Sequence, residues 1–268
     1  MAGSLTRAPS ASPLPLDGAP VRALVLIALA LVLAGCARTD YTWGWYVLDP
    51  THPKGGANLR FLLSGLWATI AIASCALLVS VVLGVALAVA GLSRHPLLRA
   101  VNRVYVEVFR AIPLLVLLLW VYYGLPVVLG LSLGVFAAGV LSLALSDAAF
   151  EAEVFRAGIQ SVPRGQLEAA ETLGLSGAQK FRYVVLPQAI RSILPALGNQ
   201  FVYVLKMSSL VSVIGFQELT RRANELNVTE YRPLEIYTFL VVEYLVLILI
   251  ASWLVRRLEA RMARGSAR

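Results

Sequence analysis

Residues 65–91 read GLWATIAIASCALLVSVVLGVALAVAG and contain no charged side chain. An α-helix rises about 1.5 Å per residue, so about 20 apolar residues cross the roughly 30 Å hydrocarbon layer of a bilayer. Backbone polar groups in hydrocarbon must be hydrogen-bonded within their own segment, and a helix achieves this. The stretch therefore predicts a membrane-spanning helix, which fixes the class of the protein.

Three further runs have the same character: residues 111–146 hold no charge, residues 192–217 are interrupted only by Lys206, and residues 236–255 only by Glu243. The first run is too long for one span. Its Gly124-Leu125-Pro126 predicts a tight turn, because proline removes a helical hydrogen bond and restricts the residue before it. We therefore expect an all-α membrane protein with five core transmembrane helices, near 62–92, 105–125, 128–155, 190–216 and 234–256.

Composition and charge agree with this class. The chain is 59% hydrophobic and 14% charged, against about 25% charged in soluble domains. Placing residue 40 outside puts 14 Lys and Arg residues in inner segments and 6 in outer ones, the asymmetry typical of membrane proteins. The C-terminus is then cytoplasmic. Contact with anionic membrane lipid accounts for the net charge of +8, so we expect no nucleic-acid partner.

The N-terminal region leaves three interpretations open. Residues 1–22 are rich in Ser, Ala and Pro and are expected to be disordered. Residues 23–36 form a short apolar segment that ends in Leu33-Ala34-Gly35-Cys36. It is a retained short helix, which we favour, a cleaved signal, or a lipoprotein signal that would leave Cys36 lipidated. Residues 37–60 are then periplasmic, residues 61–257 the transmembrane domain and residues 258–268 a cytoplasmic tail.

The inner loop at residues 161–189, SVPRGQLEAAETLGLSGAQKFRYVVLPQA, has the signals of two short helices. Pro163 lies near a helix start, where its missing N–H costs little. Residues 166–173 are mostly good helix formers. Gly174 is the residue type expected just past a helix end, where the backbone turns left-handed.

The second half of this loop has its own signals. Ser176 and Gln179 have the spacing of a capping box, which starts the next helix. Pro187 is expected to stop or bend that helix. The pattern predicts two short helices at a sharp angle, in an ordered loop that serves as a contact surface.

The loop resembles the EAA–G–(I/V)xLP signature of permease subunits of bacterial ABC importers. Glu168-Ala169-Ala170, Gly174 and the Leu186-Pro187 pair carry the match. The resemblance implies the type I permease fold. It also implies that the helix before Gly174 is a coupling helix, which docks into a cleft on a separate ATP-binding subunit.

The resemblance extends from about residue 61 to residue 259, and over this range the chain is similar to the polar amino acid subfamily of these permeases. Met207 departs from it, because that subfamily often has an acidic or amide residue after the lysine. This puts the exact substrate in doubt. The other matching segments are residues 65–70, 110–115, 122–126, 152–156, 158–163, 194–199 and 209–215.

Energy must come from a partner. A phosphate-cradling GxxxxGK[ST] loop is absent around the three lysines, Lys54, Lys180 and Lys206. We expect no enzyme activity and no cofactor in this chain, with ATP and Mg²⁺ bound by the ATPase subunit. The resemblance further implies a second permease subunit, identical or related, and a periplasmic amino-acid-binding protein.

Charged residues in the spans are the remaining candidates for function, because such groups are costly and usually meet a cavity or a partner. Lys206 and Glu243 form either an ion pair that fixes packing or part of a substrate pathway, to which Ser208 and Ser209 are assigned. A cluster further along the chain is interpreted as interfacial: Asp147, Glu151, Glu153 and Arg156. The two histidines and two cysteines are too scattered to predict a metal site.

Two rival functions remain. An ion-coupled secondary transporter working alone would need internal repeats and more spans, and it leaves the ordered inner loop unexplained. A permease of the same type for another small solute satisfies every sequence feature. The sequence therefore predicts an importer permease in the inner membrane more firmly than it predicts polar amino acids as the cargo.

Overall fold

The computed structural model describes residues 41–264. The expected disordered N-terminus at residues 1–22, the apolar segment at residues 23–36 and Cys36 lie outside the described residues. Tyr41 and Trp43 belong to a separate unit, in which their rings pack edge to face. The main unit begins at Gly44.

The described part of the main unit is helical. Its elements in chain order are η1 (Trp45–Val47), α2 (Pro53–Leu92), α3 (Pro96–Ala111), α4 (Leu114–Leu119), η2 (Trp120–Gly124), α5 (Leu125–Leu129), α6 (Val135–Gln160), α7 (Arg164–Thr172), α8 (Gly177–Lys180), η3 (Phe181–Val185), α9 (Leu186–Met207), η4 (Ser208–Ile214), α10 (Leu219–Glu230) and α11 (Pro233–Arg264).

Four of these helical stretches are long and apolar enough to cross a membrane: α2, α6, the continuous stretch Gly177–Ile214, and Pro233–Met262 of α11. A fifth span is completed if α3 and Leu114–Leu129 count as one, although these two meet at 102°. The expectation of an all-α membrane protein is confirmed, with four to five candidate spans among residues 41–264.

The prediction of one continuous helix over 105–125 is wrong, because the chain bends at Ile112-Pro113. Ile112 is extended, with ψ of 124°, as expected for a residue before proline. At Pro126, where a turn was predicted, the chain stays helical, since the wider π turn η2 directly before it absorbs the missing hydrogen bond. The turn comes at Gly130, with φ of +67°.

Pro187 behaves in the same way. The π turn η3 precedes it, and the helix continues into α9, so of the two expected outcomes, a stop or a bend, the stop at Pro187 is wrong. The first core helix also starts earlier than expected, at Pro53 rather than near residue 62. Proline at the first helical position loses no hydrogen bond, which suits Pro53 to that start.

The spans pack closely where one helix presents glycine. A Cβ atom on Gly139 of α6 would lie 2.6 Å from Val211 Cγ1, and one on Gly158 would lie 2.3 Å from Ile193 Cγ1. Small residues allow membrane helices to approach in this way. The main buried cluster joins α2, α4, α6, α9, η4 and α11, and its members include Ile72, Ala76, Leu118, Leu143, Leu205 and Leu247.

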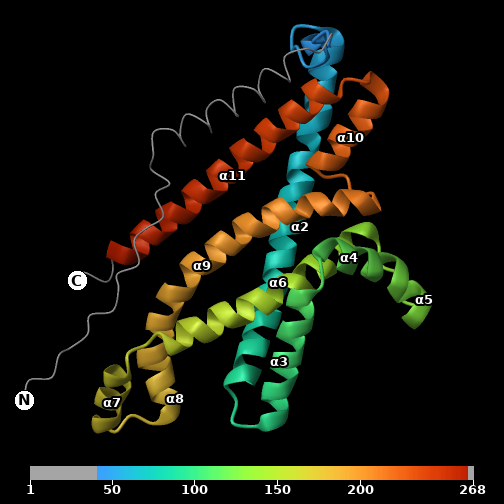
Figure 1. Cartoon of the computed structure of the whole chain (residues 1–268). Helices are drawn as coiled ribbons and strands as arrows, with labels where there is room; N and C mark the ends of the chain where they lie inside the picture. Colours follow the sequence, from blue (N-terminus) through green and yellow to red (C-terminus); the bar gives the residue numbers. More distant parts are fainter. Residues whose placement is uncertain (1–40, 265–268) are drawn as a thin grey trace, which may run out of the picture. The chain divides into compact units, whose positions relative to one another are not determined.

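The two ends of the main unit carry different elements. Figure 1 shows α7 and α8 at the same end as the α2–α3 turn, and α10 at the opposite end with η1. A second buried cluster, which includes Val47, Leu62, Leu226 and Ile236, ties η1, α2, α10 and α11 together at that opposite end. The fold therefore separates the α7–α8 loop from α10 by the length of the spans.

Candidate functional site

The α7–α8 loop is held by backbone geometry at its turn. Gly174 follows α7 with φ of +73°. Its N–H donates to the Glu171 carbonyl at 2.9 Å, and the Leu175 N–H donates to the Ala170 carbonyl at 3.1 Å. This pair of bonds is a Schellman motif, which satisfies carbonyls that the helix end leaves free. The prediction that Gly174 ends the helix in a left-handed conformation is confirmed.

The predicted capping box is also present. The Gln179 N–H donates to Ser176 Oγ at 3.4 Å, and the Ser176 N–H donates to Gln179 Oε1 at 2.9 Å. Lys180 then pairs with Glu171 across the turn, with 3.1 Å between Nζ and Oε1. These contacts fix α7 and α8 relative to each other.

The structure divides the predicted coupling residues into two groups. Glu168, Ala169, Gly174, Leu186 and Pro187 are exposed, whereas Ala170 is buried. A small buried residue allows α7 to lie against its own loop, so Ala170 supports the surface that the others present.

Sequence reasoning missed one residue of this surface. Leu173, which directly follows α7, is 79% exposed. An apolar side chain beside the glycine that ends a polar helix was the available signal. An exposed leucine at an ordered turn adds apolar area to the surface of this loop.

Within a candidate span, Lys206 lines a shallow, open cavity of ≈370 Å³ between the α9–η4 segment and α11. Ser209 lies in the same wall, and its hydroxyl donates to the Lys206 carbonyl at 2.8 Å. Ser208 does not reach the cavity, because it is fully buried and donates to the Leu205 carbonyl. The other lining residues are Val241, Tyr244, Leu245 and Ile248.

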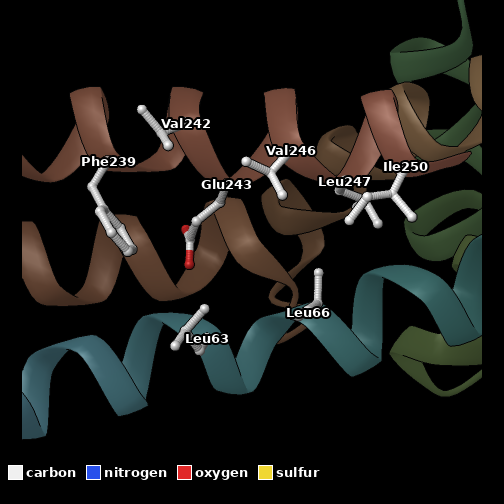
Figure 2. Close-up of a pocket in the computed structure, with 8 residues that line it drawn as sticks. All are labelled: Leu63, Leu66, Phe239, Val242, Glu243, Val246, Leu247 and Ile250. Carbon is white, nitrogen blue, oxygen red and sulfur yellow. The ribbon is translucent and has the colours of Figure 1, made fainter. Parts of the chain in front are cut away.

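Glu243 lies in a different pocket. Figure 2 shows its carboxylate between α11 and α2, near Leu63, in a cavity of ≈230 Å³ whose other lining residues are apolar. Glu243 is 8% exposed, and neither carboxylate oxygen has a hydrogen-bond partner in the described chain. No ion pair joins it to Lys206 within residues 41–264, so that alternative is wrong for this chain.

The interpretation of Asp147 and Glu151 as an interfacial cluster is also wrong. Asp147 is 3% exposed, and Glu151 is fully buried. Asp147 Oδ2 accepts the Ser80 hydroxyl of α2 at 2.9 Å, and Oδ1 accepts the Gln200 amide of α9. Burial of these acids follows from the close approach of α2 and α6, where a Cβ on Gly84 would lie 2.8 Å from Glu151 Cβ.

The two remaining members of that cluster behave differently. Glu153 and Arg156 form an ion pair at 2.5 Å one turn apart, and both side chains are more than one-third exposed. Glu151 has no partner for either oxygen in the described chain. Among residues 41–264, no group of three His, Cys, Asp or Glu residues could hold a metal ion.

Comparisons with known proteins fit this arrangement. Residues 80–264 match the family described as "binding-protein-dependent transport system inner membrane component". The chain is 37% identical over 206 residues to the L-cystine transport system permease protein TcyL of Bacillus subtilis. The match covers 75% of this chain and 86% of that protein. It is 40% identical over 160 residues to the glutamine transport system permease protein GlnP of Escherichia coli, covering 59% of this chain and 73% of that one.

Solved structures give the same picture. The crystal structure of an amino acid ABC transporter with histidines contains a chain that is 39% identical, with a TM-score of 0.76. The match covers 82% of this chain and all of that one. The MetNI methionine ABC transporter, at 22% identity and a TM-score of 0.64, shares the fold.

Proposed function

The chain belongs to the family of inner-membrane components of binding-protein-dependent transport systems, and from this premise we propose that it is the permease of an ATP-driven importer of polar amino acids. Similar permeases are named for L-cystine and glutamine, and a similar transporter structure holds histidines. These solutes share the α-amino acid group and a polar side chain or linkage. That shared chemistry is the class of cargo that we assign.

The observation that carries the proposal is the α7–α8 loop. Its turn is ordered by a Schellman motif and a capping box, yet Glu168, Ala169 and Leu173 are exposed. An ordered surface that contributes little to the core of its own chain is suited to a partner. We assign it to docking in a cleft of the ATPase subunit, with Gly174 setting the bend.

Partners follow from the chemistry that this chain lacks. With no phosphate-cradling loop in its sequence, it needs an ATPase subunit that binds ATP and Mg²⁺. A chain with four to five candidate spans encloses half a pathway, so a second permease, identical or related, completes it. The cargo arrives on a binding protein, as the family name states.

Transport then works as an equilibrium between two arrangements of the spans. Closure of the paired ATPase subunits on ATP pushes the two coupling loops together, and the helix bundles turn from inward-open to outward-open. Transport depends on how differently ATP and the loaded binding protein stabilise the two states. The chain contributes the α7–α8 loop, through which the ATPase moves the spans, and half of the pathway wall.

Reconstitution tests this function. In vesicles that hold this permease with its ATPase, uptake of an amino acid against its gradient should require both ATP and the loaded binding protein. The chain alone should carry out no uphill transport. Concentrative uptake by the chain alone, without nucleotide, would overturn the proposal and favour an ion-coupled transporter.

The cargo class is tested separately by calorimetry on the binding protein. Tight binding of a polar amino acid is expected, and tight binding of another solute only would replace the cargo while leaving the transport mechanism in place.

The orientation has its own test. We place the α7–α8 loop and the C-terminus in the cytoplasm, because 14 Lys and Arg residues then lie inside and 6 outside. A reporter that is active only in the periplasm should be silent when it is fused after residue 268. Activity of that fusion would reverse the orientation.

A further inference from the structure

Tyr244 of α11 lies in the wall of the Lys206 cavity, and sequence reasoning did not select it. Its hydroxyl donates to Glu218 Oε2 at 2.8 Å and lies 3.2 Å from Thr220 Oγ1. The side chain is therefore held at the backbone and at the hydroxyl. The ring keeps one orientation against the cavity.

Glu218, which accepts the hydrogen bond from the Tyr244 hydroxyl, is fully buried, which is an unusual position for a carboxylate. It is the N-cap of α10, where its carboxylate accepts the N–H of Thr220 at 2.9 Å and that of Arg221 at 2.7 Å. The positive end of a helix dipole favours a carboxylate at this position. Burial raises the pKa of Glu218, and the hydrogen bonds donated to it oppose that shift.

The backbone around Glu218 is fixed by α2. A Cβ on Gly65 would lie 2.8 Å from the carbonyl carbon of Glu218, so the two backbones are in direct contact. The Leu219 N–H donates to Thr69 Oγ1 at 3.3 Å. Glu218 is thus tied to α2 by its backbone and its neighbour, to α10 by capping, and to α11 through Tyr244.

The cavity presents two features that suit an amino acid zwitterion. Lys206 is exposed in this chain although it lies within a candidate span, and such a cation is expected to face a polar path or a partner rather than lipid. An aromatic ring attracts a cation to its face. A carboxylate is therefore favoured near Lys206, and an ammonium near the Tyr244 ring.

We infer that Tyr244 contacts the substrate by receiving the α-ammonium of an amino acid whose α-carboxylate meets Lys206, and that Glu218 is the positioning residue that holds the ring. The inference rests on the proposed function, because it requires the Lys206 cavity to be part of the transport pathway. It adds a basis for recognising the amino acid group that different polar amino acids share.

The test measures amino acid binding to the purified permease–ATPase complex without the binding protein. The probes are L-glutamine, L-histidine and L-cystine, each compared with its analogue that lacks the α-amino group and its analogue that lacks the carboxylate. The variants are Tyr244→Leu, Tyr244→Phe, Glu218→Gln and Lys206→Met. Matched controls are Tyr237→Phe, whose hydroxyl bonds Asn224 instead, and Glu225→Gln, an α10 acid that pairs with Arg221.

Loss of the ring should weaken zwitterion binding by about two- to thirtyfold, the range of a cation–π contact. Tyr244→Leu should leave binding of the deaminated analogue unchanged, and Lys206→Met should not weaken binding of the decarboxylated analogue, because it removes a like charge. If Tyr244→Leu keeps wild-type affinity while Lys206→Met loses it, the inference fails and the pathway assignment stands. If neither variant changes binding, or if none of the probes binds, the pathway assignment or the amino acid cargo fails with it.

Glu218 is tested by coupling. Tyr244→Phe and Glu218→Gln should weaken zwitterion binding by similar factors, and the double variant should be no weaker than either, because both remove one interaction. Binding of the deaminated analogue should not change in any of the three. An equal loss for both probes in Glu218→Gln would show a general structural role and overturn the positioning assignment. Tyr244→Phe keeps the ring, so it tests the positioning by Glu218 even if Tyr244→Leu does not assemble.

Discussion

The α7–α8 loop and the charged residues of the spans place the same kinds of side chain in opposite surroundings. In the loop, Glu168 is exposed, and Glu171 pairs with Lys180 at the surface. In the spans, Glu151 is fully buried without a hydrogen-bond partner among residues 41–264, and Glu243 lies in an apolar pocket. Short-range signals order the loop, whereas helix packing decides the surroundings of the buried acids. Changes in the loop should therefore disturb contact with a partner, and changes in the spans should disturb stability or the pathway.

The largest expected effect tests the loop side of this comparison. Gly174→Val forces a β-branched residue to φ of +73°, and Glu168→Lys reverses the exposed charge. Each variant should reduce co-purification of the ATPase at least about tenfold, a factor that corresponds to a loss of about 1.4 kcal/mol in binding free energy. For Gly174→Val the loss comes from the cost of a left-handed backbone at a β-branched residue. For Glu168→Lys it comes from the reversed charge. The permease should still reach the membrane.

The control is Gly177→Val, three residues further on, where a Cβ meets open space and φ is not positive. Normal ATPase recovery with both loop variants would break the comparison, because the loop would then be ordered for some other reason.

An effect of comparable size is expected at the cavity. Lys206→Met removes a charge that can bond a substrate carboxylate, a contact worth about 1.5–3 kcal/mol. Affinity of the complex for its amino acid should fall by roughly tenfold or more, while ATPase recovery stays normal. Lys54→Met, at an exposed position, is the control. Wild-type affinity and rate in Lys206→Met would exclude a substrate role for this residue.

The buried acids of α6 offer a sharper contrast, because in the part of the chain that the structure describes Asp147 has hydrogen-bond partners and Glu151 has none. Asp147→Ala leaves the Gln200 amide without this acceptor, whereas the Ser80 hydroxyl keeps the Leu77 carbonyl at 2.9 Å. The free energy of unfolding should fall by about 1–3 kcal/mol. Glu151→Met keeps the length of the side chain and removes an unpartnered carboxylate. Stability should then be unchanged or higher.

Thermal unfolding of the two variants in detergent, beside the wild type, measures this difference. Equal destabilisation of both would mean that Glu151 has a partner that the chain alone does not supply, such as the second permease.

The smallest effect concerns the capping box. Ser176→Ala removes the acceptor for the Gln179 N–H and should cost about 1 kcal/mol locally. Faster amide hydrogen exchange at residues 177–180 should report it, with little change in global unfolding. Ser64→Ala, whose hydroxyl only bonds the Phe61 carbonyl one turn back, is the control and should leave exchange in the loop unchanged.

The sequence predicted the loop more accurately than the spans. Pro163, Gly174, Ser176 and Gln179 act within a few residues of their own position, so their effects could be read directly from the chain. Pro113 and Pro126 could not be told apart in the same way. Both follow residues with apolar side chains, and only the tertiary structure shows that one bends the chain by 102° while a π turn carries the helix through the other.

Sequence alone determined that this is a helical membrane protein with an ordered loop between two spans, because long uncharged runs and local capping signals depend on composition and short spacing. Tertiary structure decided which charged groups are buried together, why Lys206 and Glu243 lie in separate cavities, and how Glu218 reaches Tyr244. The physical reason is that spans which are apolar on most of their surface carry little periodicity to mark a buried face. The crossing of helices and the close approach of glycines at Gly65, Gly84 and Gly139 then set the neighbours.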